Sequence, residues 1–96
     1  MLIRFGEDKI TKTGFTKNLS LTGVSINTNS VFAPGTTLQL ELRFPSRTLS
    51  MWGRVMWAKK VPVSLAHVVD CGMGVSFLEP PEDWPDFFRE WEKENK

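Results

Sequence analysis

The residues of this chain best suited to chemistry lie in one short segment, residues 18–23, with the sequence NLSLTG. Asn18 and Ser20 carry short polar side chains that can bond to the backbone or to a ligand, and Gly23 follows three positions after the serine. We expect Gly23 to adopt a backbone dihedral that other residues resist. This pattern predicts a turn that presents two polar side chains and closely approachable backbone at one place.

Other combinations of reactive residues are poor candidates for catalysis or for binding a metal. A nucleophilic Ser20 would need a base and an oxyanion site, but its flanking leucines do not form a nucleophile elbow, and the only histidine is His67. His67, Asp70 and Cys71 are suggestively spaced, but no fourth metal ligand is evident. We therefore expect no enzyme activity, no metal site and no cofactor.

Composition restricts the class of protein and of partner. The 96 residues, 41% of them hydrophobic, suffice for one core, which predicts a single domain over residues 1–96. Lys and Arg number 12 against 11 Asp and Glu, so no strong field attracts a polymeric nucleic acid. There is no 18-residue apolar run and only one cysteine, so we expect no membrane insertion and a reducing, cytoplasmic location.

Short apolar runs separated by Gly, Pro, Asn and Ser predict that antiparallel strands hold the turn in place. In the clearest strand, Leu38, Leu40, Leu42 and Phe44 alternate with polar residues, so one face of the strand should be buried. The expected strands are residues 2–5, 13–18, 23–28, 37–44, 49–59 and 72–78.

The fifth of these strands contains a glycine and two tryptophans whose placement depends on local irregularity. Gly53 predicts a bulge or sharp bend of the kind that closes a small barrel. Trp52 and Trp57 lie at an odd separation, which places them on opposite faces unless a bulge at Gly53 shifts the phase. We expect one tryptophan in the core and the other exposed, where it could stack on a flat ligand or contact a protein.

The C-terminal residues change from a strand pattern to a helix pattern. Trp84, Phe87, Phe88 and Trp91 form one helical stripe, and Asp83 before them can cap the helix. We expect a helix over about residues 82–95, with at least three of these aromatic side chains buried. The helix could close an open end or side of the barrel, or it could bind a partner.

Five segments of the chain, taken in order, resemble a PilZ domain. They are GFT at residues 14–16, the NLSLTG turn, FAPGTT at residues 32–37, WGRV at residues 52–55 and GMGVSF at residues 72–77. The resemblance covers about residues 1–78. It implies a mainly β fold, a six-stranded antiparallel barrel followed by a C-terminal α-helix, and a non-enzymatic signalling module of the bacterial cytoplasm.

The resemblance also implies a ligand, because PilZ domains are receptor modules for cyclic di-GMP. Family members hold it with an [Asp/Asn]-x-Ser-x-x-Gly turn, which Asn18, Ser20 and Gly23 match here. They also use an Arg-x-x-x-Arg stretch just before the first strand. Guanidinium groups suit that role because they bond phosphate oxygens and the O6/N7 edge of guanine with two parallel hydrogen bonds.

The arginine element of the family is missing from this chain. Arg4 is the only arginine before Arg43, and Asp8 stands four positions after it. Nearby lysines substitute poorly because an ammonium lacks the planar fork, so the loss should cost about 10²- to 10⁴-fold in affinity. Two functions therefore remain open. One is a cyclic di-GMP receptor that uses the turn with Arg4 as its guanidinium, and the other is a PilZ-like adaptor that binds a protein partner, for instance in motility or pilus assembly, and not the nucleotide.

Overall fold

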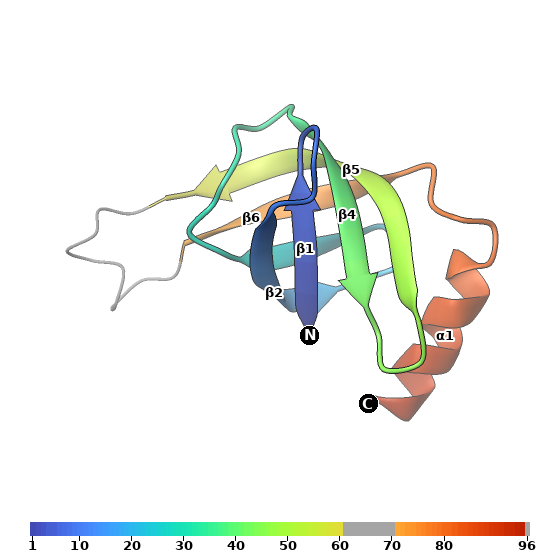
Figure 1. Cartoon of the computed structure of the whole chain (residues 1–96). Coiled ribbons are helices and arrows are strands. Elements are labelled where there is room, and N and C mark those ends of the chain that lie inside the picture. Colours follow the sequence, from blue (N-terminus) through green and yellow to red (C-terminus); the bar gives the residue numbers. More distant parts are fainter. Residues whose placement is uncertain (61–70, 96) are drawn as a thin grey trace.

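Six strands form a closed antiparallel β-barrel, followed by one helix, in the computed structural model of the chain, which describes residues 1–60 and 71–95 (Figure 1). The expected mainly β fold is confirmed, and each strand begins and ends within one residue of its expected bounds. The elements are β1 (Leu2–Gly6), β2 (Lys12–Leu19), β3 (Gly23–Asn27), β4 (Thr37–Arg43), β5 (Thr48–Lys59), β6 (Gly72–Leu78) and α1 (Trp84–Glu94).

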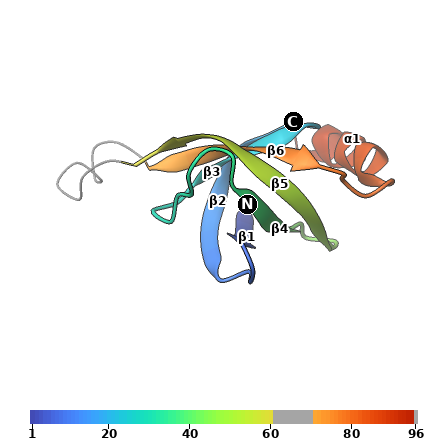
Figure 2. The same ribbon diagram turned by 90° about the horizontal axis from the view of Figure 1, so that it is seen from above.

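The order of strands around the barrel is β1-β2-β3-β6-β5-β4, and β1 pairs with both β2 and β4 to close it. Strand β6 lies between β3 and β5, and the view from above shows β5 and β6 running side by side (Figure 2). The NLSLTG turn joins β2 to β3. Residues that are distant in the sequence, on β2, β3, β6 and β5, therefore share one outer surface beside this turn.

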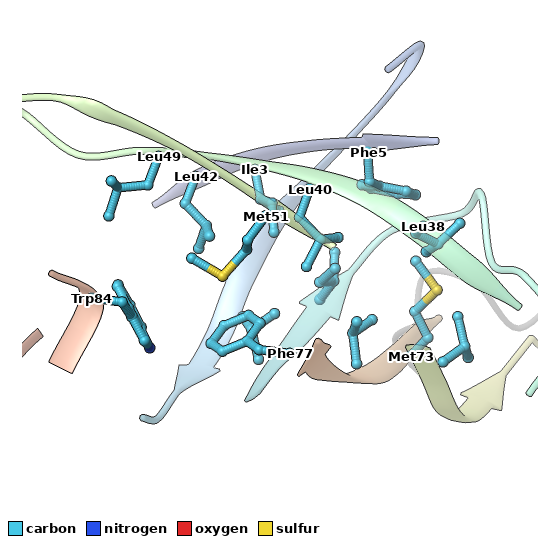
Figure 3. Close-up of a cluster of buried hydrophobic side chains, with 14 of the residues drawn as sticks. Ile3, Phe5, Leu38, Leu40, Leu42, Leu49, Met51, Met73, Phe77 and Trp84 are labelled. Atoms are coloured by element: carbon cyan, nitrogen blue, oxygen red, sulfur yellow. The ribbon is translucent and has the colours of Figure 1, made fainter. Parts of the chain in front are cut away.

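The inward-facing residues of the strands fill the barrel. Leu38, Leu40 and Leu42 are fully buried, as the period of two in β4 predicts. Ile3 and Phe5 of β1 stand opposite two of these leucines, and Figure 3 shows all five side chains in the interior. Because a slip of one residue would turn such side chains to solvent, this packing determines the register of the strands.

The irregularity in β5 does not lie where the sequence predicts it. Gly53 keeps the register with both neighbouring strands, and it faces a core where a Cβ would overlap a valine side chain of β6. The register shifts instead between Val55 and Trp57. The expectation of one buried tryptophan is wrong, because this bulge turns Trp57 outward to the same face as Trp52. The two side chains are 49% and 48% exposed, respectively.

Helix α1 packs against one end of the barrel beside the β4–β5 connection (Figure 1). Trp84 and Phe88 are buried, whereas Phe87 and Trp91 are only partly buried, so two aromatic side chains are fully enclosed where at least three were expected. The reason is that Phe87 and Trp91 pack on the rim, where both meet the ring of Phe44 edge to face. The aromatic stripe contacts the barrel, as the interpretation of α1 as a closing element predicts.

Asp83 occupies the N-cap position of α1 without capping it through its side chain. Its backbone is in the αR region, whereas a capping side chain normally projects from an extended residue. The carboxylate instead accepts a 2.8 Å hydrogen bond from Arg47 Nη1 in the β4–β5 connection. The expected cap is therefore wrong, and Pro85 in the first turn remains the local signal that starts the helix.

Candidate functional site

The NLSLTG turn is closed by its own backbone and by the side chain of Ser20. The backbone N–H of Ser20 donates to the carbonyl oxygen of Gly23 at 2.9 Å. In return, the N–H of Gly23 donates to Ser20 Oγ at 3.2 Å, and this hydroxyl also lies 3.2 Å from the Gly23 carbonyl oxygen. Ser20 therefore holds the shape of the turn while remaining on the exposed surface.

Two carbonyl groups at the tip of the turn are anchored to other elements. The Thr22 carbonyl oxygen accepts a 2.8 Å hydrogen bond from the backbone N–H of Phe77 in β6. The Leu21 carbonyl oxygen accepts a 2.8 Å bond from the indole N–H of Trp84 in α1. The turn is thus held in place before any ligand arrives, which reduces the entropy cost of binding.

Gly23 is needed for a different reason from the one that the sequence suggests. Within the described residues, the glycine with a positive φ is Gly35, at 94°, so the dihedral expected for Gly23 is wrong. A Cβ added to Gly23 would lie only 2.5 Å from the carbonyl oxygen of Val75. The close approach of the β6 backbone therefore excludes a side chain at this position.

Asn18 reaches the outer surface through a bulge. Thr16 stands opposite the buried Ile26, so strict alternation would turn Asn18 toward the interior as well. The register of β2 against β3 shifts between Thr16 and Asn18, and this shift turns the amide of Asn18 outward. The side chain is exposed and accepts no hydrogen bond from the described residues.

Asn18 stands at one end of a row of residues that crosses four strands. It is opposite Ser25 of β3, Ser25 is opposite Gly74 of β6, and Gly74 is opposite Trp57 of β5. Directly opposed residues point to the same face of a sheet. A bulge at each end of the row therefore places an amide, a hydroxyl and an indole along one line on the outside of the barrel.

The row borders a shallow pocket of about 240 Å³ between the turn and β5. This volume lies below the roughly 300 to 1,000 Å³ of pockets that enclose a drug-sized ligand, so the pocket suits one base of a nucleotide better than a whole dinucleotide. Its two large apolar lining residues are Met56 and Trp57. Its polar lining residues are Asn18, Ser20, Thr22, Ser25 and Ser76.

The structure brings the predicted site residues together only in part. The three turn residues line the pocket, but Arg4 does not. Arg4 lies on β1, opposite Thr13 and Glu41. Its Nη2 donates to the carbonyl oxygen of Ile10 at 3.1 Å, and its Nη1 is 3.9 Å from Glu41 Oε1. Its guanidinium is therefore engaged within the β1–β2 hairpin, toward the end of β2 away from the turn.

A second guanidinium lies closer to the turn. Arg54 of β5 stands opposite Ser76 of β6, and Ser76 stands opposite Gly23. Arg54 is exposed, and it forms no ion pair with any residue that the structure describes. Sequence reasoning missed Arg54, because its nearness to the turn depends on β6 pairing between β3 and β5. For Trp57, the sequence indicated only that either this residue or Trp52 would be exposed.

Two further features were sought in residues 1–60 and 71–95, a cluster of metal ligands and a membrane-spanning helix. In those ranges no group of three or more His, Cys, Asp or Glu side chains is placed to hold a metal ion. No helix there is long and apolar enough to cross a membrane. Cys71 is buried, and His67 and Asp70 lie outside the described residues.

A family model described as PilZ domain matches residues 3–84, which include the barrel except for its first residue, Leu2, and extend to the first residue of α1. The chain belongs to the PilZ family. PilZ domains are binding and signalling modules related to cyclic di-GMP, and they are not enzymes. Comparison of this PilZ domain with curated proteins and with solved structures gave no significant match.

Proposed function

We propose that this PilZ domain binds cyclic di-GMP beside the NLSLTG turn and acts as a non-enzymatic receptor module in the bacterial cytoplasm. One observation carries the proposal. Asn18, Ser20 and Gly23, which match the turn pattern of the family, line one pocket on a turn anchored at both Thr22 and Leu21. A preorganised polar turn next to an open pocket is what recognition of a flat, polar base requires.

The polar groups of the turn suit the edge of a guanine. The Asn18 amide offers both a donor and an acceptor, which complement the mixed acceptors and donors of the base. Ser20 Oγ accepts from the Gly23 N–H, and a hydroxyl has a second lone pair left for a ligand N–H. The absence of a side chain at Gly23 lets a ligand approach the backbone at the end of the turn.

Affinity should be lower than in a family member with two arginines before the first strand. Arg4 is engaged with the Ile10 carbonyl oxygen and lies near Glu41, away from the pocket. Charge-assisted bonds from two guanidinium groups correspond to about 10²- to 10⁴-fold in affinity. The turn and its surroundings would have to provide most of the binding in this chain.

Calorimetric titration with cyclic di-GMP, combined with ¹H–¹⁵N NMR at high micromolar ligand, tests the proposal. We expect saturable heat and chemical-shift changes at residues 18–23. Asn18→Ala should weaken binding, whereas Asn29→Ala, at another exposed asparagine that does not line the pocket, should not. The absence of both heat and shift changes would reject the receptor function.

A protein-binding adaptor role is the second candidate function. Large apolar side chains are exposed in the pocket, in the turn and on β2: Met56, which lines the pocket, is 60% exposed, Leu21 of the turn 46%, and Phe15 of β2 60%. Exposed apolar residues grouped on one surface are typical of protein contact sites. In this case cyclic di-GMP would give no signal. Phe15→Ser would then abolish capture of a protein partner, for instance from a motility or pilus system, without lowering the melting temperature.

A further inference from the structure

We propose that a second pocket, at the C-terminal end of α1, docks a segment of a partner protein that carries a carboxylate next to a large apolar side chain. The pocket has a volume of about 450 Å³, within the roughly 300 to 1,000 Å³ of pockets that enclose a ligand. It shares no lining residue with the pocket beside the NLSLTG turn. The inference therefore goes beyond cyclic di-GMP binding and does not depend on it.

Three segments that are distant in the sequence form this pocket. They are the start of β1, the end of β4 with the residues that follow it, and the last turn of α1, which Figure 1 shows at the same end of the molecule. Trp84, at the start of α1, is bonded to the NLSLTG turn, whereas Trp91 and Asn95 line the second pocket. A helix rises about 1.5 Å per residue, so the two tryptophans are roughly 10 Å apart along its axis. The two pockets are thus separate sites at opposite ends of α1.

The walls of the second pocket are apolar and partly open to solvent. The ring of Phe44 meets the indole of Trp91 edge to face, with their centroids 5.7 Å apart. Phe44 is buried, but Trp91 and Leu2, which both line the pocket, are only partly buried. An apolar side chain seated between them would remove further apolar surface from water, which is favourable. The shape and lining therefore suit one large apolar side chain.

Arg43 places a positive charge at the edge of this pocket. Its Nε donates a 2.9 Å hydrogen bond to Glu41 Oε1, while its two Nη groups donate to no residue that the structure describes. Arg4 Nη1 lies 3.9 Å from the same carboxylate oxygen, so two guanidinium groups share one carboxylate, and these three side chains together carry one net positive charge. The bond to Glu41 orients the guanidinium, and its Nη groups remain available for a carboxylate of the ligand.

The apolar surface continues beyond the pocket, which favours a protein segment over a small carboxylate. Leu2 stands directly opposite Phe15 of β2, and directly opposed residues point to the same face of a sheet. Phe15 is 60% exposed. A ligand with a second apolar group can therefore contact the pocket and Phe15 together, and exposed apolar residues beside a pocket are typical of protein contact sites.

NMR titration of the full chain with four small probes tests the inference. N-acetylphenylalanine carries a carboxylate and one apolar side chain, its amide lacks the charge, and acetate lacks the apolar group. N-acetylphenylalanyl-leucine adds a second apolar side chain. We expect the indole N–H signal of Trp91 to shift saturably with the acid, and the amide and acetate to bind at least about 10-fold more weakly. The dipeptide should bind about 3- to 10-fold more tightly than the single amino acid.

Two pairs of matched variants assign these effects to residues. Arg43→Gln should remove the preference for the acid over the amide. Arg47→Gln should not, because the Arg47 side chain is about as exposed, at 44% against 46%, but is paired with Asp83 and does not line the pocket. Phe15→Ser should remove the gain from the second apolar side chain, whereas Met56→Ser, at a residue that is also 60% exposed but lines the other pocket, should not.

The outcomes separate this inference from the receptor function. Equal binding of the acid and the amide to the wild type, an equal effect of Arg47→Gln, or no saturable shift of the Trp91 signal would each reject the inference. If the acid binds but the dipeptide binds no more tightly, the pocket is a site for a small carboxylate, and docking of a protein segment is wrong. Should Arg43→Gln fail to fold, the comparison of acid and amide on the wild type decides. Cyclic di-GMP binding is measured separately, and none of these results would reject it.

Discussion

The indole N–H of Trp84 donates a 2.8 Å hydrogen bond to the carbonyl oxygen of Leu21, and so joins two residues that are 63 positions apart. Trp84 is the first residue of α1 and is almost completely buried. Leu21 lies in the NLSLTG turn, between the pocket-lining residues Ser20 and Thr22. The bond makes the start of the closing helix part of the support of the candidate ligand site.

Trp84→Phe should destabilise the domain by about 2 to 4 kcal/mol. The substitution leaves the Leu21 carbonyl without its donor and opens a cavity in the barrel end. Urea denaturation measures the loss, and amide exchange at residues 20–23 should accelerate. Trp91→Phe is the control, because Trp91 is only partly buried on the same helix and its indole donates to no described residue. An equal loss in both variants would show that the hydrogen bond contributes nothing.

Gly23→Ala and Gly35→Ala should both destabilise the domain, but only the first should weaken cyclic di-GMP binding. At Gly35, with φ of 94° and no atom near the added Cβ, the cost is the left-handed backbone alone, about 1 to 2 kcal/mol. At Gly23 the Val75 carbonyl oxygen must move, which displaces the turn from β6. Denaturation and calorimetry measure the two effects. Unchanged affinity in Gly23→Ala would contradict the close-approach explanation.

The ion pair between Arg47 and Asp83 should contribute little to stability despite its short distance of 2.8 Å. The two side chains are 44% and 53% exposed, and pairs of this kind typically contribute about 0.2 to 1 kcal/mol. A double-mutant cycle with Arg47→Gln and Asp83→Asn measures the coupling, which should fall with added salt. The same cycle for Arg89 and Asp86, at 3.7 Å and more exposed, should give a smaller value.

Arg54→Gln should lower cyclic di-GMP affinity more than Arg4→Gln does. Arg54 stands opposite Ser76, which lines the pocket, whereas Arg4 stands opposite Thr13 toward the other end of β2, and a single exposed guanidinium contact with phosphate corresponds to about 10-fold. Arg43→Gln serves as the control, since Arg43 is paired with Glu41 on β4. Calorimetry at two salt concentrations measures the difference. A larger loss of affinity in Arg4→Gln than in Arg54→Gln would contradict this prediction and would indicate that Arg4 contacts the ligand.

Local patterns made much of the fold predictable. The alternation of Leu38, Leu40 and Leu42 requires only that one face of a strand be buried, so the sequence indicates it directly. The helical stripe that includes Trp84 and Phe88 is equally local. The position of the bulge was not predictable, because whether Gly53 or a later residue breaks the register depends on how β5 fits β6.

The sequence by itself determined the six strands, the C-terminal helix, the family and the polar turn at residues 18–23, because each depends on spacing within a few residues. Only the tertiary structure decided which residues meet that turn. It brought Trp57 and Arg54 toward the turn, kept Arg4 away and made Gly23 a point of close contact with Val75. The physical reason is that strand pairing between distant segments, together with a bulge at each end of one row, determines which side chains face outward side by side.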